Sequence, residues 1–112
     1  MPYTTGMKMI AETEIFIKYA AGIWSNLERN DFISWIASNP EAGDLIPESG
    51  RCRKVRWSRQ GTGKRGGARI IYFLAQDAAV WLLIVYTKSK FYNLPSAFLA
   101  KLKTEVEYVI RN

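Results

Sequence analysis

The sequence predicts an α+β fold in which a small, antiparallel-rich sheet carries two helices from the N-terminal half and one helix from the C-terminal end. Two early segments and one late segment repeat apolar residues at helical spacing, and three middle segments have the alternation or the branched and aromatic residues of strands. The predicted order is β-α-α-β-β-β-α. Since 112 residues suffice for one hydrophobic core, we expect a single domain over residues 7–112, preceded at residues 1–6 by either a disordered extension or a misassigned start.

The first half of the chain carries clear helix signals. After a short strand expected at residues 7–11, Thr13 is the predicted N-cap of a helix. The apolar residues that follow at three- and four-residue spacing form its predicted buried face: Ile15, Phe16, Tyr19, Ala20, Ile23 and Leu27. Ser25 and Glu28 have the spacing of a capping box, which predicts that a second helix starts there. Its predicted buried residues are Phe32, Trp35 and Ile36.

A loop and then the first strand of the main sheet are expected in the middle of the chain. The asparagine-proline pair at residues 39–40 ends the second helix, because proline disfavours helical geometry in the residue before it. Residues 41–50 predict a loop, since they contain two glycines and a proline between acidic and apolar residues. Residues 52–58 alternate, which places Lys54 and Arg56 on one face of a strand and apolar residues on the other.

Two further strands and a last helix complete the predicted fold. Residues 68–74 and 80–87 are rich in branched and aromatic residues and predict central strands joined by a tight turn at residues 76–78. Pro95 suits the first turn of the final helix. The apolar stripe predicted for this helix consists of Phe98, Leu99, Leu102, Val106, Val109 and Ile110.

The positive charge of the chain is concentrated in one segment. Residues 1–50 hold three Lys and Arg against seven Asp and Glu, a net charge of −4, whereas residues 51–112 hold thirteen against three, a net charge of +10. Half of the basic residues form one cluster: Arg51, Arg53, Lys54, Arg56, Arg59, Lys64, Arg65 and Arg69. No carboxylate interrupts it, and because such density repels itself, the segment predicts contact with a polyanion rather than a merely solvated face.

The composition argues against a metal enzyme, a disulfide-stabilised protein and a membrane protein. The chain has no histidine and one cysteine, Cys52, so we expect neither a metal site nor a cofactor. Without a histidine to activate it, Cys52 is expected to be a buried filler rather than a nucleophile. The start of the sequence lacks the pattern of a secretion signal, and no apolar run approaches the roughly 20 residues of a membrane span, which predicts a cytoplasmic protein.

Arg69 is the most informative single residue of the sequence. It lies inside an otherwise apolar predicted strand, where a charge must be paired or must face a cleft. A structural ion pair with a carboxylate of the first half and a role in a nuclease cleft are the two alternatives. At the end of the next strand, Tyr86 is either a packing residue or an aromatic that stacks on bases, and Lys88 favours a contact with phosphate. Trp57 and Trp81 are expected to be core residues.

A glycine-rich stretch at residues 61–67 connects the first two strands of the predicted meander. It satisfies the spacing GxGxxG, but a strand is expected after it rather than the helix that a dinucleotide-binding loop requires. We therefore expect a hairpin connection whose Lys64 and Arg65 contact phosphates, since glycines let the backbone come close to a nucleic-acid strand.

Four segments of the chain resemble the HigB-like toxins of the RelE superfamily. Asn39-Pro-Glu-Ala-Gly-Asp-Leu-Ile-Pro47 is similar to the loop before the family's sheet, and Arg53-Lys-Val-Arg56 to its basic strand. Gly63-Lys-Arg-Gly-Gly-Ala-Arg-Ile-Ile-Tyr72 resembles the family's glycine-arginine hairpin, and Val85-Tyr-Thr-Lys88 the segment after it. The likeness covers nearly the whole chain and implies a RelE-like fold.

This resemblance implies a small ribonuclease that cuts messenger RNA on the ribosome and is held by an antitoxin, often a HigA-like helix-turn-helix protein that also represses the operon. It places Lys54, Arg56, Arg69 and Lys88 at active-site positions, and we add Tyr86 as a further candidate catalytic residue. The expected RNA-binding residues are Arg51, Arg53, Arg59, Lys64 and Arg65.

The expected reaction is attack of an RNA 2′-hydroxyl on the adjacent phosphate. Without histidine, proton transfer falls to Lys54, Lys64 or Tyr86, while the arginines stabilise the phosphorane charge. The chain departs from the family pattern at Gly50-Arg51, where a Gly-Gly pair is frequent, and at Ser89, where RelE itself has a second active-site arginine, so the acid of the leaving group stays open. Two alternatives remain, a nucleic-acid- or ribosome-binding module without chemistry and an antitoxin-like repressor, and the repressor ranks last because the sequence has no helix-turn-helix pattern.

Overall fold

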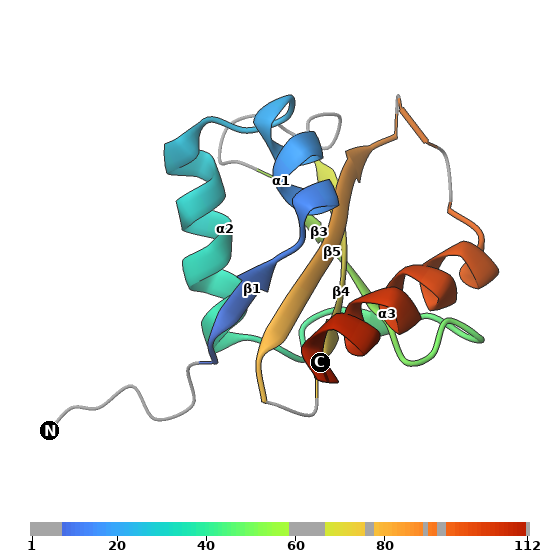
Figure 1. Cartoon of the computed structure of the whole chain (residues 1–112). Helices are drawn as coiled ribbons and strands as arrows, with labels where there is room; N and C mark the ends of the chain where they lie inside the picture. The colour runs from blue at the N-terminus through green and yellow to red at the C-terminus, as the bar shows by residue number, and fades with distance from the viewer. Residues whose placement is uncertain (1–7, 59–66, 76–77, 89, 92–93, 112) are drawn as a thin grey trace, which may run out of the picture.

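A computed structural model describes residues 8–58, 67–75, 78–88, 90–91 and 94–111. In it, a mixed sheet of five strands lies between two layers of helices (Figure 1). The strands are β1 (Ile10–Glu12), β2 (Asp44–Leu45), β3 (Arg53–Trp57), β4 (Ala68–Leu74) and β5 (Val80–Thr87). Their order across the sheet is β1-β5-β4-β3-β2, with β1 parallel to β5 and the other neighbours antiparallel. The predicted α+β class is confirmed.

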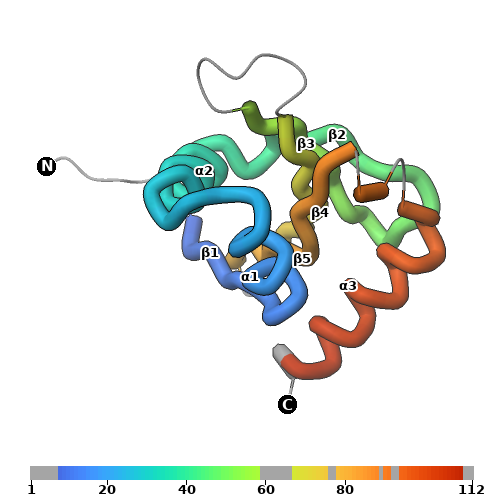
Figure 2. The backbone as a smooth tube through the Cα atoms, turned by 90° about the horizontal axis from the view of Figure 1, so that it is seen from above, coloured from blue at the N-terminus to red at the C-terminus, as the bar shows by residue number. Residues whose placement is uncertain are grey.

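The helices cover both faces of the sheet. Helices α1 (Glu14–Ala21) and α2 (Asn26–Ser38) lie on one side, and α3 (Ser96–Arg111) crosses the other side (Figure 2). No helix within the described ranges has the length and apolar character that a membrane span needs. The sheet is thus enclosed from both sides by the helices of the described residues.

The helix starts follow the capping signals of the sequence. The Thr13 hydroxyl accepts a hydrogen bond from the Phe16 amide at 3.0 Å and donates one to the Leu83 carbonyl at 2.9 Å, so it both caps α1 and ties it to β5. At the start of α2, the Glu28 amide donates to the Ser25 hydroxyl, and the Ser25 amide donates to the Glu28 carboxylate. Both predicted caps are confirmed, and α1 ends at Ala21 with Gly22 as its C-cap.

The two ends of β1 and the presence of the edge strand β2 differ from the prediction. Strand β1 spans Ile10–Glu12 rather than residues 7–11, of which residue 7 lies outside the described residues. The predicted loop at residues 41–50 contains the edge strand β2, which pairs with β3 and extends the order to β-α-α-β-β-β-β-α. With two residues, β2 is too short to show a period of two in the sequence.

Four residues assigned to buried helix faces are exposed. Leu27 is 72% exposed because α1 ends before it and it occupies the first turn of α2 instead. Ile15, Phe98 and Val109 are 39%, 42% and 68% exposed, since they lie at the margins of their apolar stripes. The side chain of Ile110, also expected on the stripe of α3, lies outside the described residues. Helix periodicity alone thus overestimated the width of the buried faces.

Two hydrophobic clusters join the layers, one on each face of the sheet. The cluster under α1 and α2 is centred on the buried side chains of Phe16, Phe32, Ile36, Ile70 and Tyr72. The cluster under α3 contains Cys52, Ile71, Phe73, Leu83, Ile84, Tyr86 and Leu99. Trp57 packs against the first cluster and Trp81 against the second, which agrees with the packing role expected for both.

Candidate functional site

Three of the predicted catalytic residues form a row across the sheet. Arg56 of β3 lies directly opposite Arg69 of β4, and Arg69 lies directly opposite Tyr86 of β5. Residues in such register share a face, with Cβ atoms about 4.5–5.5 Å apart in neighbouring strands. Lys54 lies two residues from Arg56 along β3 and therefore on the same face. We call Lys54, Arg56, Arg69 and Tyr86 the cationic row.

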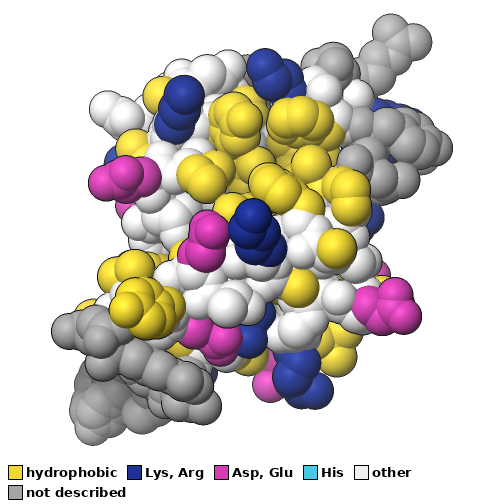
Figure 3. All heavy atoms as spheres, turned by 45° about the vertical axis from the view of Figure 1, so that its right-hand side comes forward, with side chains coloured by type: hydrophobic (Ala, Val, Ile, Leu, Met, Phe, Trp, Pro, Cys, Tyr) yellow, Lys and Arg dark blue, Asp and Glu magenta, His cyan; other side chains and the backbone are white. Residues whose placement is uncertain are grey.

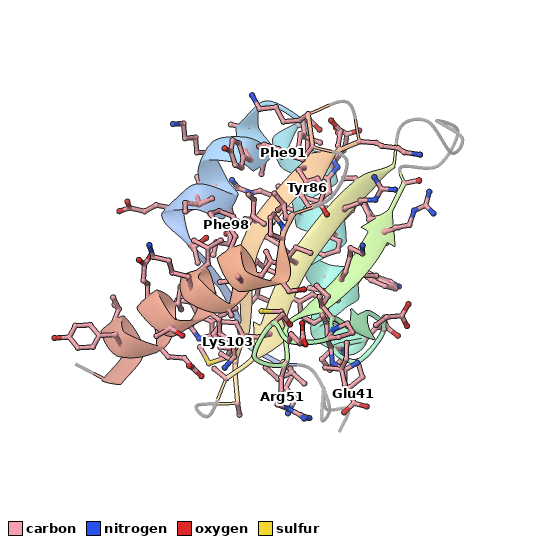
Figure 4. The ribbon with its side chains drawn as sticks, turned by 90° about the vertical axis from the view of Figure 1, so that its right-hand side faces the viewer. Glu41, Arg51, Tyr86, Phe91, Phe98 and Lys103 are labelled. Atoms are coloured by element: carbon pink, nitrogen blue, oxygen red, sulfur yellow. The ribbon has the colours of Figure 1, made fainter. Side chains whose placement is uncertain are left out.

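Helix α3 leaves this end of the sheet uncovered. Figure 4 shows α3 crossing the opposite half of the sheet, while the ends of β3 and β4 beside Tyr86 extend past it. The burial of the β4 side chains on this face changes along the strand. Ile71 and Phe73 belong to the core cluster under α3, whereas Arg69 is only half-buried. The same face of the sheet is thus hydrophobic core at one end and a cationic surface at the other.

The structure disfavours the ion-pair alternative for Arg69. Within the described ranges, neither Arg69 nor Arg56 forms an ion pair with a carboxylate, although the ion pairs Arg29–Glu12 and Lys103–Glu107 are present elsewhere. Two like charges directly opposite each other in a sheet are destabilising. The pair is therefore expected to gain stability when an anion lies over it.

Tyr86 combines a buried ring with a position at the edge of this cationic surface. Its side chain is 2% exposed, and its ring packs edge-on against Phe91 with 5.9 Å between centroids. Burial raises the pKa of the Tyr86 hydroxyl above its ordinary value of 10.0, and the charge of Arg69 acts in the opposite direction. Because the hydroxyl keeps its proton at neutral pH, Tyr86 can donate a hydrogen bond or a proton but does not serve as a base. Its packing and functional roles are compatible.

The acidic half of the chain supplies a neighbour for Lys54. Asp44 of β2 lies directly opposite Lys54 of β3, so the two side chains share a face of the sheet. Opposite charges at directly opposed positions of a sheet interact favourably. Asp44 lies outside residues 51–69, which contain no carboxylate, so the charge pattern of that segment alone does not reveal it.

Two of the predicted RNA-binding residues lie at the other end of β3. Arg51 and Arg53 line a small cavity of about 230 Å³ together with Lys103 and Glu107. Figure 4 shows Arg51 and Lys103 at the opposite end of the sheet from Tyr86. The structure therefore separates these two arginines from the pair Arg56 and Arg69, because Arg53 lies three residues and Arg51 five residues before Arg56, or roughly 10 and 16 Å along the chain.

Arg53 has a structural role at this end. Its guanidinium Nη1 donates to the Gly43 carbonyl at 2.7 Å, while the Gly43 amide donates to the Tyr72 hydroxyl at 2.9 Å. The Tyr72 hydroxyl in turn donates to the Pro40 carbonyl at 2.8 Å. These bonds fasten the loop before β2 to β3 and β4, and so hold Asp44 opposite Lys54.

The remaining predicted site residues lie partly outside the described residues. Arg59, Lys64, Arg65 and Ser89 belong to ranges that are not described. Lys88 follows the end of β5 and is exposed, near Tyr86 in the chain. Cys52 is fully buried, and burial raises the pKa of its thiol, which agrees with a packing role rather than a nucleophilic one.

The buried acids of the fold predict a loss of stability at alkaline pH. Burial raises the pKa of the Cys52 thiol above 9.0 and the pKa of the Tyr72 and Tyr86 hydroxyls above 10.0. Between the unfolded and folded pKa values the unfolded chain has released protons that the folded chain keeps, so the free energy of unfolding falls as pH rises above about 9. Urea denaturation from pH 7 to 11 measures this, and Tyr86→Phe should flatten the part above pH 10. A constant urea midpoint across this range would contradict it.

No protein-family model matches the sequence. Within the described ranges, no three His, Cys, Asp or Glu side chains come close enough to hold a metal ion together. The candidate site is therefore defined by the geometry of the cationic row itself: two opposed arginines, a lysine on the same face and a protonated phenol at its margin.

Proposed function

We propose that this protein is a ribonuclease toxin of the RelE/HigB type, which cuts messenger RNA on the ribosome and is silenced by an antitoxin. The observation that carries the proposal is the register that sets Arg56 and Arg69 side by side on the part of the sheet that α3 leaves uncovered, with the buried Tyr86 directly beside Arg69. Two opposed arginines without a carboxylate partner among the described residues suit a phosphate, since the guanidinium fork matches phosphate oxygens. The reaction class and the partners in this proposal come from the resemblance of four sequence segments to HigB-like toxins.

The proposed reaction forms a bond between the RNA 2′-oxygen and the neighbouring phosphorus and breaks the bond from phosphorus to the 5′-oxygen. The 2′-hydroxyl loses its proton, the 5′-oxygen gains one, and a 2′,3′-cyclic phosphate remains. Arg56 and Arg69 stabilise the extra negative charge on the phosphorane oxygens, which is often the largest catalytic term. The protonated Tyr86 hydroxyl is placed to donate to the phosphorane or to the leaving 5′-oxygen.

Lys54 has a different role in this scheme. Lys54 lies on the same face of β3 as Arg56, where its ammonium group would act as a cation toward phosphate. Because Tyr86 is protonated, the proposed acceptor of the 2′-hydroxyl proton is Lys54 or Lys64. Lys88, exposed beyond the end of β5, would contact the RNA backbone on the same side as Tyr86.

The proposed partners are messenger RNA on the ribosome and a HigA-like helix-turn-helix antitoxin, met in the cytoplasm. A negative or aromatic surface on the antitoxin would suit the cationic row, because complementary potentials speed and orient association. The competing function is a ribosome- or nucleic-acid-binding module that uses the same cations without chemistry. It is favoured by the absence of histidine, the commonest acid-base catalyst.

The two functions differ in what the protein does to ribosome-bound messenger RNA. The toxin proposal predicts that the purified protein cuts messenger RNA on programmed ribosomes and leaves a cyclic phosphate or its hydrolysed form. Induced expression should halt growth, and a small helix-turn-helix protein encoded by the neighbouring gene should restore it. Ribosome binding without cleavage, together with harmless expression, would support the binding module instead. Mapping the fragment ends by primer extension gives the result.

A further inference from the structure

A small pocket lies on the other side of Tyr86 from Arg69. Its volume is about 310 Å³, and it is enclosed by α1 on one side and by the end of β5 with the following turn on the other. The pocket residues with chemical significance are Lys18 and Tyr19 of α1, Tyr86 of β5, and Lys90 after β5. Since Tyr86 belongs to both, the pocket continues directly from the cationic row.

Aromatic rings form and support one wall of this pocket. Tyr19 packs edge-on against Phe91 with 6.2 Å between ring centroids, and Phe91 packs edge-on against Tyr86 with 5.9 Å. Figure 4 shows Phe91 beside Tyr86 at the end of the sheet that α3 leaves uncovered. Phe91 therefore holds the two tyrosines in place, and an aromatic wall of fixed position suits the planar surface of a nucleobase.

The rim of the pocket is cationic. Lys18 and Lys90 are both exposed and come from elements far apart in the sequence, and no carboxylate lines the described part of the pocket. Figure 3 shows an apolar area on this side of the molecule with Lys and Arg side chains along its border. A base-sized apolar pocket with a cationic rim is the combination by which proteins bind single-stranded nucleic acids.

We propose that this pocket binds one nucleotide of the RNA strand, next to the phosphate that Arg56 and Arg69 hold. The base packs against the partly exposed ring of Tyr19 in the pocket, next to the buried Tyr86, and the backbone phosphate of that nucleotide lies between Lys18 and Lys90. This assignment rests on the proposed function, because it takes RNA to be the polyanion over the cationic row. It also means that α1, which belongs to the acidic half of the chain, contacts the RNA.

The charge part of the proposal is tested by the salt dependence of RNA binding. Each phosphate that the protein neutralises contributes about −0.7 to the slope of log affinity against log salt for a single strand, so Lys18→Ala/Lys90→Ala, which removes both contacts to one phosphate, should reduce the slope by about 0.7. The probe is a short 2′-O-methyl oligoribonucleotide, which lacks the attacking hydroxyl, measured by fluorescence anisotropy. The matched control is Lys8→Ala/Lys101→Ala, which removes two exposed lysines that do not line the pocket and should leave the slope unchanged.

The aromatic part is tested by Tyr19→Leu. This change keeps an apolar side chain of similar bulk but removes the ring, so affinity should fall about fivefold or more while the salt slope stays the same. Circular dichroism and thermal melting establish that the variant is folded. An Ile17→Leu control, on an exposed position of α1 that does not line the pocket, should bind as the unchanged protein does.

The outcomes separate this inference from the proposed function. Equal slopes for the two double variants, no change on Tyr19→Leu, or no measurable binding of the probe by the unchanged protein would overturn the pocket assignment. If the pocket variants behave as expected but the protein never cuts messenger RNA on programmed ribosomes, the nucleotide site stands and the ribonuclease function fails. If Arg69→Ala abolishes cleavage while the pocket variants bind and cut as the unchanged protein does, the ribonuclease function stands and the nucleotide site fails.

Discussion

Arg69→Ala should abolish cleavage of ribosome-bound messenger RNA while the protein stays folded. Removing one preorganised group that stabilises developing charge lowers kcat by about 100- to 1,000-fold. Because Arg69 lies opposite Arg56 and forms no ion pair with a described carboxylate, its removal relieves like-charge repulsion rather than exposing a buried acid. The melting temperature should therefore stay level or rise by a few degrees.

Matched variants decide what a loss of cleavage means for Arg69. Lys101→Ala removes one exposed charge from α3 and should leave cleavage unchanged, which controls for a general electrostatic effect. Arg69→Lys keeps the charge but loses the guanidinium fork and should restore only part of the rate. A folded Arg69→Ala protein that cuts at the unchanged rate would defeat the site assignment. A protein that melts far below the unchanged one would show that Arg69 has a structural role, contrary to the absence of an ion pair.

Gly43→Ala should lower the free energy of unfolding by about 2–4 kcal/mol, from overpacking and from strain on a buried hydrogen bond. A Cβ atom at this position would lie 2.9 Å from the Lys54 carbonyl oxygen and 2.9 Å from the Tyr72 hydroxyl. Both are held in the sheet, and the Tyr72 hydroxyl is the acceptor for the Gly43 amide. Urea denaturation measures the loss.

Two further variants test the cause of this destabilisation. Gly22→Ala places its Cβ in ordinary contact, 3.7 Å from the nearest atom, and should change stability far less. Tyr72→Phe leaves the buried Gly43 amide without its acceptor, which costs about 1–3 kcal/mol. Because Tyr72→Phe also removes one of the two clashing atoms, the double variant should lose less than the sum of the single losses. Additive losses would show that the Tyr72 hydroxyl is not the source of the clash.

The elements that the sequence predicted correctly are those specified by neighbouring residues. The caps at Thr13 and Ser25 depend on hydrogen bonds that span three residues, so their spacing in the chain is their geometry. Strands β4 and β5 have the predicted bounds, since continuous runs of branched and aromatic residues suit a strand buried on both faces. By contrast, β2 exists because β3 offers a partner, which two residues of sequence do not reveal.

The candidate site also has features that the sequence predicted and features that it did not reveal. Alternation along β3 was enough to predict that Lys54 and Arg56 share a face, and the charge of Arg69 within an apolar run was enough to single it out. The pairing of Arg56 with Arg69 and of Arg69 with Tyr86 depends on the register between strands. That register depends on the turns between the strands and on which face of each strand is buried, so no single segment reveals it.

The sequence by itself therefore determined the fold class, the caps and the sign of the charge along each segment of this protein. Only the tertiary structure decided which charges meet. It places Arg51 and Arg53 toward the opposite end of β3 from the pair Arg56 and Arg69, sets Asp44 opposite Lys54, and brings Lys18 of the acidic half beside Tyr86. The reason is physical: backbone geometry and capping act over a few residues, whereas electrostatic interactions depend on distance in space, which follows from strand order and helix packing.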